Sequence, residues 1–426
     1  MVFLDRQKIR AKFPALQQEI NHQPVVFFDG PGGTQVPNSV IEAMSNYLKE
    51  ANANAHGAFA TSIRTDRLVN SARLAMSDFL GCDRHEIVFG ANMTTMTFAF
   101  SRAIAQELKP GDEIIVSPLD HYANVSPWVA LKEKGVVIRT IKLNLEDCTL
   151  NLADLQRQIN QRTKLVAIGY AANAVGTINN VAEVVKIAHS VDALVFIDAV
   201  HYAPHGLIDV RALDCDFLTC SAYKFFGPHV GIFYGKQQHL NRLRPYKVKP
   251  APTEIPDRWE TGTQNFEGLA GLVATINYLA ELGYQIFPSA ENRRTAIVRA
   301  MTAIHDYEQE LCQYLVTGLL EIPGLTLYGI SQLKHFAWRT PTVGIRMRGQ
   351  TPYAMAKALG DRGIFTWHGN FYALGLTERL GIEVSGGLLR IGLVHYNTFD
   401  EINRLLTALT EIAEVSHDNY PLTSQL

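Results

Sequence analysis

The 426-residue sequence contains few cysteines, and no two of them form a CxxC pair. The five are spread along the chain, at Cys82, Cys148, Cys215, Cys220 and Cys312. This spacing indicates neither a metal site nor a disulfide framework. We therefore interpret the cysteines as reduced, mostly buried apolar residues.

The sequence also lacks long apolar runs and long runs of one charge. No stretch reaches the ~18 apolar residues of a membrane span, and the first residues, MVFLDRQKIRAKF, lack the apolar centre of a signal peptide. The 41 acidic and 39 basic residues give a net charge of −2, which does not indicate a nucleic-acid surface. We expect a cytoplasmic protein that binds neither membranes nor nucleic acid.

What the sequence does contain is the composition of an ordinary globular protein. Hydrophobic residues make up 47% of the chain and charged residues 19%, which excludes disorder. The length is sufficient for two packed domains. There is no internal repeat or low-complexity segment.

Short β-rich runs alternate with helical patterns from about residue 86 to residue 235, which predicts an α/β fold. Between the runs lie stretches such as Val181–Ser190, where apolar residues recur every three or four positions. Strands without strict alternation, separated by helices, favour a mostly parallel sheet covered on both faces. The predicted strands are Ile87–Gly90, Glu113–Ser117, Val136–Lys142, Lys164–Gly169, Leu194–Asp198, Phe217–Cys220 and Val230–Tyr234.

A smaller α+β section is predicted to follow. Its expected elements are a long helix at Ala290–Leu320, strands at Thr342–Arg346, Ile364–Trp367 and Leu388–Leu393, and helices at Pro352–Arg362 and Asp400–Val415. We expect three parts: an N-terminal segment 1–24 that packs on the small domain, a large domain 25–290 and a small C-terminal domain 291–426.

An acid and a lysine follow neighbouring predicted strands. Asp198 ends one strand, and Lys224 comes just after the next, in SAYK. Ligands of such sheets bind beyond the carboxyl ends of the strands. A pyridoxal 5'-phosphate (PLP) site needs this pair, since the lysine forms a Schiff base and the carboxylate pairs with the pyridinium nitrogen. The alternative for Lys224 is a solvated loop lysine, although its flanks are aromatic and glycine-rich rather than charged.

Several motifs in order resemble the class-V aminotransferase superfamily, especially its cysteine desulfurases. They are VFFDGPGG, IVFGANMTTMTF, SPLDHYANVSPW, YAANAVGT, FIDAVHYAPH, SAYKFFGP, RWETGTQN and LRIGLVHYNTFDEI. Each motif is weak alone, but together they cover nearly the whole chain. The resemblance implies a PLP-transferase fold of type I, with Lys224 as the Schiff-base lysine and Asp198 as the pyridinium partner.

The resemblance also implies roles around the cofactor ring. His121 matches the histidine that stacks on the pyridine, with a capping or loop histidine as the alternative. Asn173 matches the residue near the phenolic oxygen, with turn formation as the alternative. His201 stands where the desulfurases have a glutamine that bonds this oxygen, and Tyr223 stands where they have a histidine.

Other matched residues concern the phosphate and the partner subunit. Met93 and Thr94 fall where the family's phosphate loop opens a helix; the alternative for Thr94 is capping alone, and the two roles can coexist. Ser221 and Tyr223 could offer hydroxyl groups from the lysine side. Thr263 matches a residue that the family supplies to the partner's cofactor, so the resemblance implies a homodimer.

Arg390 matches the arginine that holds the α-carboxylate of an amino-acid substrate, which its planar fork suits. The alternative for an arginine in such an apolar strand is a buried ion pair. With Lys224 and His121 it completes the predicted catalytic set.

The chain departs from the desulfurases in one decisive respect. Their persulfide cysteine lies on a small-domain loop that corresponds to Gly363–Gly387, where direct alignment places Tyr372. No cysteine occurs after Cys312, and Cys220 is expected to be inert core.

We therefore predict a PLP enzyme of the desulfurase-like group that acts on an amino acid and cleaves a C–S bond in cysteine or a cysteine derivative. A PLP-dependent aminotransferase or epimerase is the alternative within the same chemistry. A catalytically silent PLP-binding scaffold is the alternative of another class.

Overall fold

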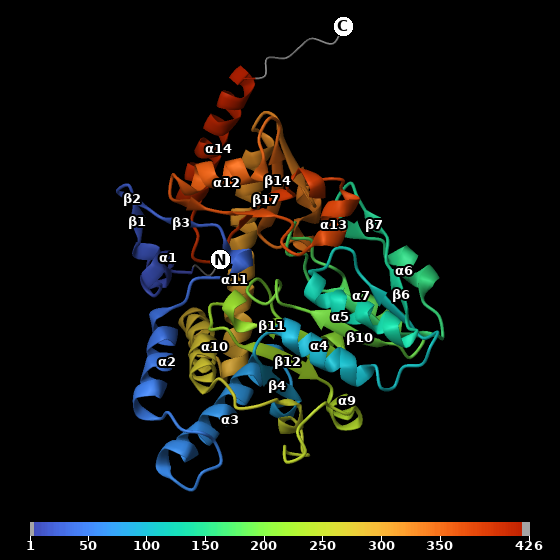
Figure 1. The fold of residues 1–426 in the computed structure, drawn as a ribbon. Helices are drawn as coiled ribbons and strands as arrows, with labels where there is room; N and C mark the ends of the chain where they lie inside the picture. The colour runs from blue at the N-terminus through green and yellow to red at the C-terminus, as the bar shows by residue number, and fades with distance from the viewer. Residues whose placement is uncertain (1–3, 420–426) are drawn as a thin grey trace.

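A computed structural model of the protein describes residues 4–419 and contains a large sheet-based part and a smaller part (Figure 1). The large part is built on a seven-stranded sheet in the order β4-β12-β11-β10-β9-β5-β6. β12 is antiparallel to both of its neighbours, and the other pairs of this sheet are parallel. All seven predicted strands are confirmed, as β4 (Ile87–Gly90), β5 (Glu113–Val116), β6 (Val137–Thr140), β9 (Thr163–Gly169), β10 (Leu194–Asp198), β11 (Phe217–Ser221) and β12 (Gly231–Gly235).

Helices cover both faces of this sheet, as predicted. On one face lie α4 (Met93–Ile104) and α5 (Ser126–Val129), and on the other α3 (Ala60–Leu80), α7 (Val181–His189) and α10 (Phe266–Ile286). Phe196 of β10 packs with Phe100 and Trp128 on the first face, while its neighbours Val195 and Ile197 pack on the second. Because successive strand residues point to opposite faces, a sheet buried on both sides needs apolar runs rather than alternation.

The smaller part has a four-stranded antiparallel sheet in the order β13-β14-β17-β16. Its strands are β13 (Leu325–Tyr328), β14 (Thr342–Met347), β16 (Trp367–Gly369) and β17 (Leu388–Gly392), and its helices are α12 (Pro352–Gly360), α13 (Leu374–Arg379) and α14 (Phe399–Asn419). The predicted strand Ile364–Trp367 is wrong as one unit, because it divides between β15 (Ile364–Phe365) and β16, which pair with different partners.

Two segments connect the parts. The helix α11 (Arg293–Leu320) runs from one to the other (Figure 1), placing Ile304 in the core of the large part and Leu311 in that of the small part. The strand β3 (Val26–Phe27) pairs in parallel with β15, and Val26 is buried in the small core. The proposed domain limits, 1–24, 25–290 and 291–426, stay predictions.

The N-terminal segment contacts both parts. The short helix α1 (Arg6–Ala11) has Asp5 as its N-cap, and the Asp5 carboxylate accepts a hydrogen bond from the backbone N–H of Lys8. Ile9 of α1 is buried in the large core, whereas Arg10 forms an ion pair of 2.8 Å with Glu401 of α14. This segment therefore fastens the small part to the large one.

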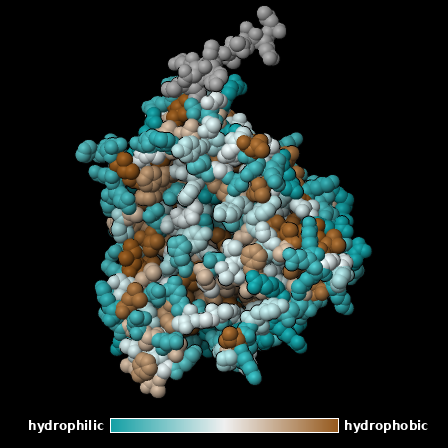
Figure 2. Space-filling view, viewed as in Figure 1, coloured by the Kyte–Doolittle hydropathy of each residue, from teal (hydrophilic) through white to brown (hydrophobic). Residues whose placement is uncertain are grey.

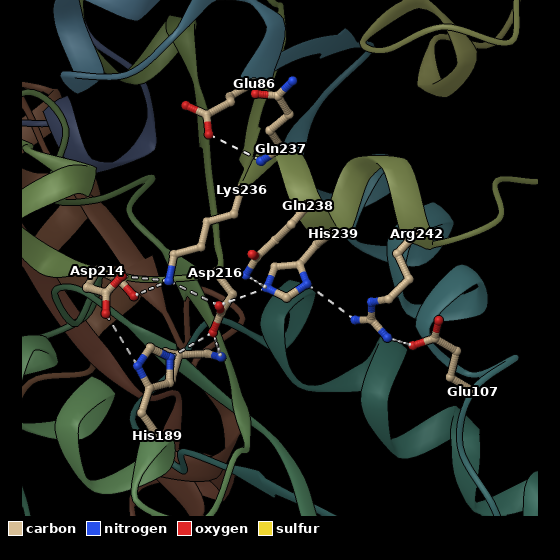
Figure 3. A network of polar contacts seen from close by, with 11 residues as sticks. Glu86, Glu107, His189, Asp214, Asp216, Lys236, Gln237, Gln238, His239 and Arg242 are labelled. Atoms are coloured by element: carbon tan, nitrogen blue, oxygen red, sulfur yellow. Dashed lines mark hydrogen bonds and ion pairs between the residues drawn. The ribbon is translucent and has the colours of Figure 1, made fainter.

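A polar network closes the edge of the large sheet at the amino ends of its parallel strands (Figure 3). Asp216, just before β11, is buried and accepts hydrogen bonds from the rings of His189 and His239, each at 3.0 Å, and from the backbone N–H of Val195. Lys236 lies 3.3 Å from the same carboxylate. These donors and the positive charge of Lys236 lower the pKa of Asp216 far below its usual value despite burial.

The remaining regular elements are short or peripheral. They are α2 (Asn38–Glu50), α6 (Leu152–Gln158), α8 (Val210–Leu213), α9 (Gln237–Arg242) and the hairpins β1–β2 (Glu19–Ile20 and Gln23–Pro24) and β7–β8 (Leu143–Asn144 and Thr149–Leu150). Figure 2 shows a surface on which hydrophilic groups predominate and hydrophobic ones form small patches. Within residues 4–419, no helix combines the length and apolar composition needed to span a membrane.

Candidate active site

A partly enclosed pocket lies beyond the carboxyl ends of the central strands of the large sheet. It is lined by Pro31, Met93, Thr94, Asp120, His121, Gly169, Ala171, Asn173, Asp198, Val200, His201, Tyr223 and Lys224. Eight of the predicted site residues therefore share this pocket. A larger hollow, between the β7–β8 hairpin and residues 329–338, is lined by none of them.

Asp198 ends β10 and is buried, with 7% of its surface exposed. One of its carboxylate oxygens accepts a hydrogen bond of 2.9 Å from the backbone N–H of Val200, which turns the chain away from the strand. Burial raises the pKa of Asp198 to about 6. Because burial disfavours the ionised form of this carboxylate, a cationic partner in the pocket would stabilise it.

Lys224 comes from the neighbouring strand, three residues after the end of β11. A short 3-10 turn over Ala222–Lys224 brings its side chain into the pocket, where the Nζ atom donates a hydrogen bond to the carbonyl oxygen of Pro31. Burial, aided by the positive charge of Arg390, lowers the pKa of Lys224 to about 7. Near pH 7 a large fraction of this amine is therefore neutral and nucleophilic. Lys224 is therefore not a solvated loop lysine, the alternative considered from the sequence.

The N-terminus of α4 borders the same pocket. Its N-cap is Asn92, whose side-chain oxygen accepts a hydrogen bond from the backbone N–H of Thr95, so the capping alternative for Thr94 is wrong. The N–H of Met93 donates to the Ser221 hydroxyl oxygen at 3.1 Å, which leaves the Ser221 proton free to be donated. A Cβ atom on Gly231 would lie 2.6–2.8 Å from the Asn92 backbone, so β12 approaches the cap this closely only with glycine.

His121 both caps a short turn and lines the pocket. Its Nδ1 atom accepts a hydrogen bond of 3.0 Å from the backbone N–H of Ala123. Burial and the positive charges of Lys224 and Arg390 lower its pKa to about 4, so the ring is neutral near pH 7. Since Nδ1 is an acceptor, the ring proton lies on Nε2.

Asn173 and Arg390 lie next to each other. The Arg390 guanidinium donates a hydrogen bond of 3.0 Å to the backbone carbonyl of Asn173, and the Asn173 side chain donates one of 2.8 Å to the carbonyl of Phe371. The side-chain oxygen of Asn173 is buried without a hydrogen-bond partner in the described structure. Among the described side chains no carboxylate lies within salt-bridge distance of Arg390, although the negative charge of Asp29 opposes the lowering of its pKa by burial.

His201 and Tyr223 occupy two other walls. His201 is buried, and its Nε2 atom lies 3.2 Å from the hydroxyl of Thr340, which comes from the smaller part. Burial keeps the pKa of His201 well below its usual value, so its ring is neutral. The Tyr223 ring stacks on His229 with their centroids 4.9 Å apart, and the Lys224 amine lies 4.8 Å from its centroid.

Thr263 does not share the pocket. It is exposed and lines a separate open hollow on the surface, together with Asn54, His56, Arg73 and Gly262. The structure therefore does not bring Thr263 together with the other predicted cofactor residues.

Sequence reasoning missed Asp120 and Pro31 as pocket residues. Asp120 is 3% exposed and accepts a 2.9 Å hydrogen bond from the Asn124 amide, and burial raises its pKa to about 7. Asp120 directly precedes His121 in the same motif, and this position was the feature of the sequence that could have identified it as a pocket residue. The GPGG turn gave no such signal, because Pro31 contributes only its backbone carbonyl to Lys224.

None of the five cysteines lines the pocket. Cys220 is fully buried in the large core, where burial raises the pKa of its thiol, as expected for an inert residue. Cys148, Cys215 and Cys312 are also buried, and Cys82 is half-buried.

The groups in the pocket fit PLP by chemistry. Lys224 supplies an amine for the aldehyde, Asp198 a buried carboxylate for the pyridine nitrogen, and α4 a helix N-terminus for the phosphate. The unpartnered oxygen of Asn173 leaves a buried polar position that a ligand group can satisfy.

Comparisons with known proteins agree with this chemistry. The family described as Aminotransferase class-V matches residues 26–405. The chain is 31% identical to a cysteine desulfurase of Salmonella dublin, over 95% of this chain and 98% of that protein. It is also 31% identical to a cysteine desulfurase of Synechococcus elongatus, over 96% of this chain but only 64% of that longer protein.

Solved structures give the same result. The apo cysteine desulfurase of Thermococcus onnurineus NA1 superposes with a TM-score of 0.87 at 26% identity, covering 97% of this chain and 100% of that one. An Escherichia coli cysteine desulfurase, solved in an S-sulfonic acid form, has a TM-score of 0.82 at 25% identity, with coverage of 97% and 99%. The chain belongs to the class-V aminotransferase family of PLP-dependent enzymes.

Proposed function

We propose that the pocket binds PLP and that the enzyme cleaves the C–S bond of cysteine or of a cysteine derivative. The observation that carries this proposal is the pairing of Lys224, with a pKa of about 7, and the buried carboxylate of Asp198 in one pocket. The family's cysteine desulfurases supply the substrate class. A silent scaffold would have no use for a reactive amine, and the buried guanidinium of Arg390, which has no carboxylate at salt-bridge distance among the described side chains, argues against it as well.

The pocket residues would hold the cofactor from several sides. Asp198 would pair with the pyridine nitrogen, and the N-terminus of α4 at Met93 and Thr94 would bind the phosphate together with the hydroxyls of Ser221 and Tyr223. The neutral ring of His121 would stack on the pyridine, and Asn173 and His201 would approach the phenolic oxygen. When bound, PLP withdraws electrons from the bonds at the Cα atom of an amino acid.

The chain's own residues then account for binding and proton transfer. Arg390 would bind the α-carboxylate with two parallel hydrogen bonds. The neutral amine of Lys224 would remove the Cα proton, since a base must lie within hydrogen-bond reach and have a pKa near the working pH. The sulfur would leave with the electron pair of the C–S bond.

The positions of the cysteines favour elimination over transfer of sulfur to the protein. No thiol in the chain lines the pocket, so the leaving sulfur has no protein nucleophile beside it. The net reaction is then an amino acid and water giving pyruvate, ammonia and the free thiol or sulfide.

Product analysis tests this function. PLP-loaded protein incubated with cysteine and with S-substituted cysteines is expected to release pyruvate and ammonia in equal amounts. Alanine together with sulfane sulfur would instead indicate desulfuration through another acceptor. Inversion at Cα, or conversion of the cofactor to its amine form without pyruvate, would favour the epimerase or the aminotransferase.

Cofactor uptake is expected to depend on pH with an apparent pKa of about 7. The neutral amine attacks the aldehyde, so the rate of PLP uptake by cofactor-free protein should rise with pH and level off above about pH 8. Stopped-flow absorbance measures this rate, with Nα-acetyl-lysine as the control amine. An uptake rate that still increases tenfold per unit at pH 9 would show that Lys224 has an ordinary pKa.

We also propose that the enzyme is a homodimer. Exposed Thr263 is available to a second subunit, and apolar side chains are exposed on α2, on α3 and at the N-cap of α3: Ile41, Leu48, Ile63, Leu74 and Phe59. Figure 2 shows hydrophobic groups on the side of the molecule where α2 lies. A monomer in sedimentation velocity would contradict this state. Cytoplasmic residence stays a prediction from the sequence.

A further inference from the structure

The segment Asn370–Tyr372 has an unusual backbone conformation beside the pocket. Phe371 and Tyr372 have φ angles of +56° and +60°, a region that bulky residues rarely adopt. Such conformations persist only where the surrounding contacts determine them, and they concentrate at functional sites. These two residues, named the aromatic pair, are therefore candidates for a role in the reaction.

Hydrogen bonds from separate parts of the chain hold the aromatic pair in place. The amide of Asn173 donates to the carbonyl of Phe371, and the backbone N–H of Tyr122 donates to that of Tyr372, each at 2.8 Å. The N–H of Tyr372 donates to the Asn370 side chain, which itself donates to Glu383. The pair is thus fixed to the pocket wall and to the smaller part.

Phe371 contacts the group that would bind the substrate carboxylate. The centre of the Arg390 guanidinium lies 4.1 Å from the centroid of the Phe371 ring, a cation–π distance. The Nε atom of this guanidinium is buried without a hydrogen-bond partner in the described structure. The Phe371 ring, the Asn173 carbonyl and the charge of Asp29 therefore act together on the orientation of the Arg390 guanidinium.

Tyr372 covers His121 at the outside of the pocket. The two rings stack with centroids 5.1 Å apart and 28° between their planes, yet 70% of Tyr372 is exposed. Trp367, 49% exposed, lies against Gly32, beside the pocket residue Pro31. The entrance thus presents exposed aromatic surface, which is typical of a surface that contacts a ligand.

We propose that the aromatic pair selects the substrate: Phe371 positions Arg390, and Tyr372 forms the wall against which an apolar or planar side chain of the amino acid packs. This inference rests on the proposed function and deepens it, since it favours cysteines with an apolar S-substituent over free cysteine. Phe371 acts through Arg390 and is a positioning residue, whereas Tyr372 contacts the substrate side chain.

Binding of amino acids that have no Cα hydrogen tests this inference without turnover. The probes are 2-aminoisobutyrate and α-methylphenylalanine, titrated calorimetrically into the PLP-loaded protein. We expect α-methylphenylalanine to bind about tenfold more tightly or better. Tyr372→Asn, which tolerates the left-handed backbone, should remove most of this preference, whereas Tyr372→Phe and the control Tyr246→Asn should keep it.

The role of Phe371 needs a different comparison. Phe371→Leu should weaken both probes equally, by about threefold to tenfold, because both carry the carboxylate. The same change should have no further effect when Arg390 is already replaced by lysine, which a merely structural role would not predict. Circular dichroism confirms that each variant is folded.

The outcomes separate the two proposals. If the wild-type protein binds both probes with equal affinity, or if Tyr372→Asn keeps the preference, the inference is wrong while the proposed function stands. If Phe371→Leu still weakens binding in the Arg390→Lys background, its positioning role is wrong. Failure of both probes to bind overturns the proposed function and this inference with it.

Discussion

Replacement of Lys224 by alanine is expected to lower turnover by at least about 10³-fold and to remove the visible absorption of the bound cofactor. Under the proposed function, the variant would lose both the amine that attaches PLP and the base that removes the Cα proton. PLP should still bind weakly, because Asp198 and the N-terminus of α4 are unchanged. Stopped-flow absorbance and a pyruvate assay measure the two effects.

Lys186→Ala is the matched control for this experiment. Its side chain is 80% exposed on α7 and lies 3.9 Å from Glu183 in a surface ion pair. Such pairs contribute little to stability, so spectrum and turnover should equal those of the wild type. A Lys224→Ala protein that keeps both the visible absorption and turnover would show that this lysine is not the attachment residue.

Replacement of Asp216 by alanine is expected to lower the free energy of unfolding by about 3 kcal/mol. The variant leaves Lys236 and two histidine rings without their shared carboxylate at a buried edge of the sheet. Lys236 keeps Asp214 as a partner at 2.7 Å, which places the loss at the lower end for a broken buried pair. Urea unfolding at pH 7 measures it, and PLP binding at the opposite edge should persist.

Acidification distinguishes this charge effect from a packing effect. The folded pKa of Asp216 is lowered, so its contribution is complete above the unfolded value of about 4 and decreases as the pH falls through the folded one. The difference between wild type and variant should therefore shrink in strong acid. Asp214→Ala, whose side chain is 66% exposed, is the control and should cost less than about 1 kcal/mol. Equal losses for both variants would contradict the central role of Asp216.

The large sheet was predictable because each of its strands is specified locally. The edge strand β6 is partly exposed and contains Arg139. The other six strands are buried on both faces, which needs an apolar run, and Leu194–Asp198 and the other five runs have this property in the sequence itself. The run Ile364–Trp367 has it too, but its residues divide between β15 and β16. Which strand pairs with which depends on contacts between distant segments. The local pattern of apolar residues does not predict these contacts.

The same limit applies to the pocket. Asp198 and Lys224 were predictable as neighbours, since Asp198 ends β10 and Lys224 follows the end of β11, the parallel strand beside it. The positions of Phe371 and Tyr372 were not, because their backbone conformation is imposed by Asn173 and Tyr122, which lie about 200 and 250 residues earlier in the chain. The contact between the Phe371 ring and the Arg390 guanidinium likewise depends on tertiary structure.

The pairing of β3 with β15 limits how the protein can be divided. A fragment beginning at residue 291 would lack Val26 and Phe28, which are fully buried in the small core, and would leave β15 as an open edge. During synthesis the first thirty residues emerge long before the strand they pair with. The smaller part therefore cannot complete its fold until β15 has been synthesised and has paired with β3, so the order of synthesis separates two strands that the fold brings together.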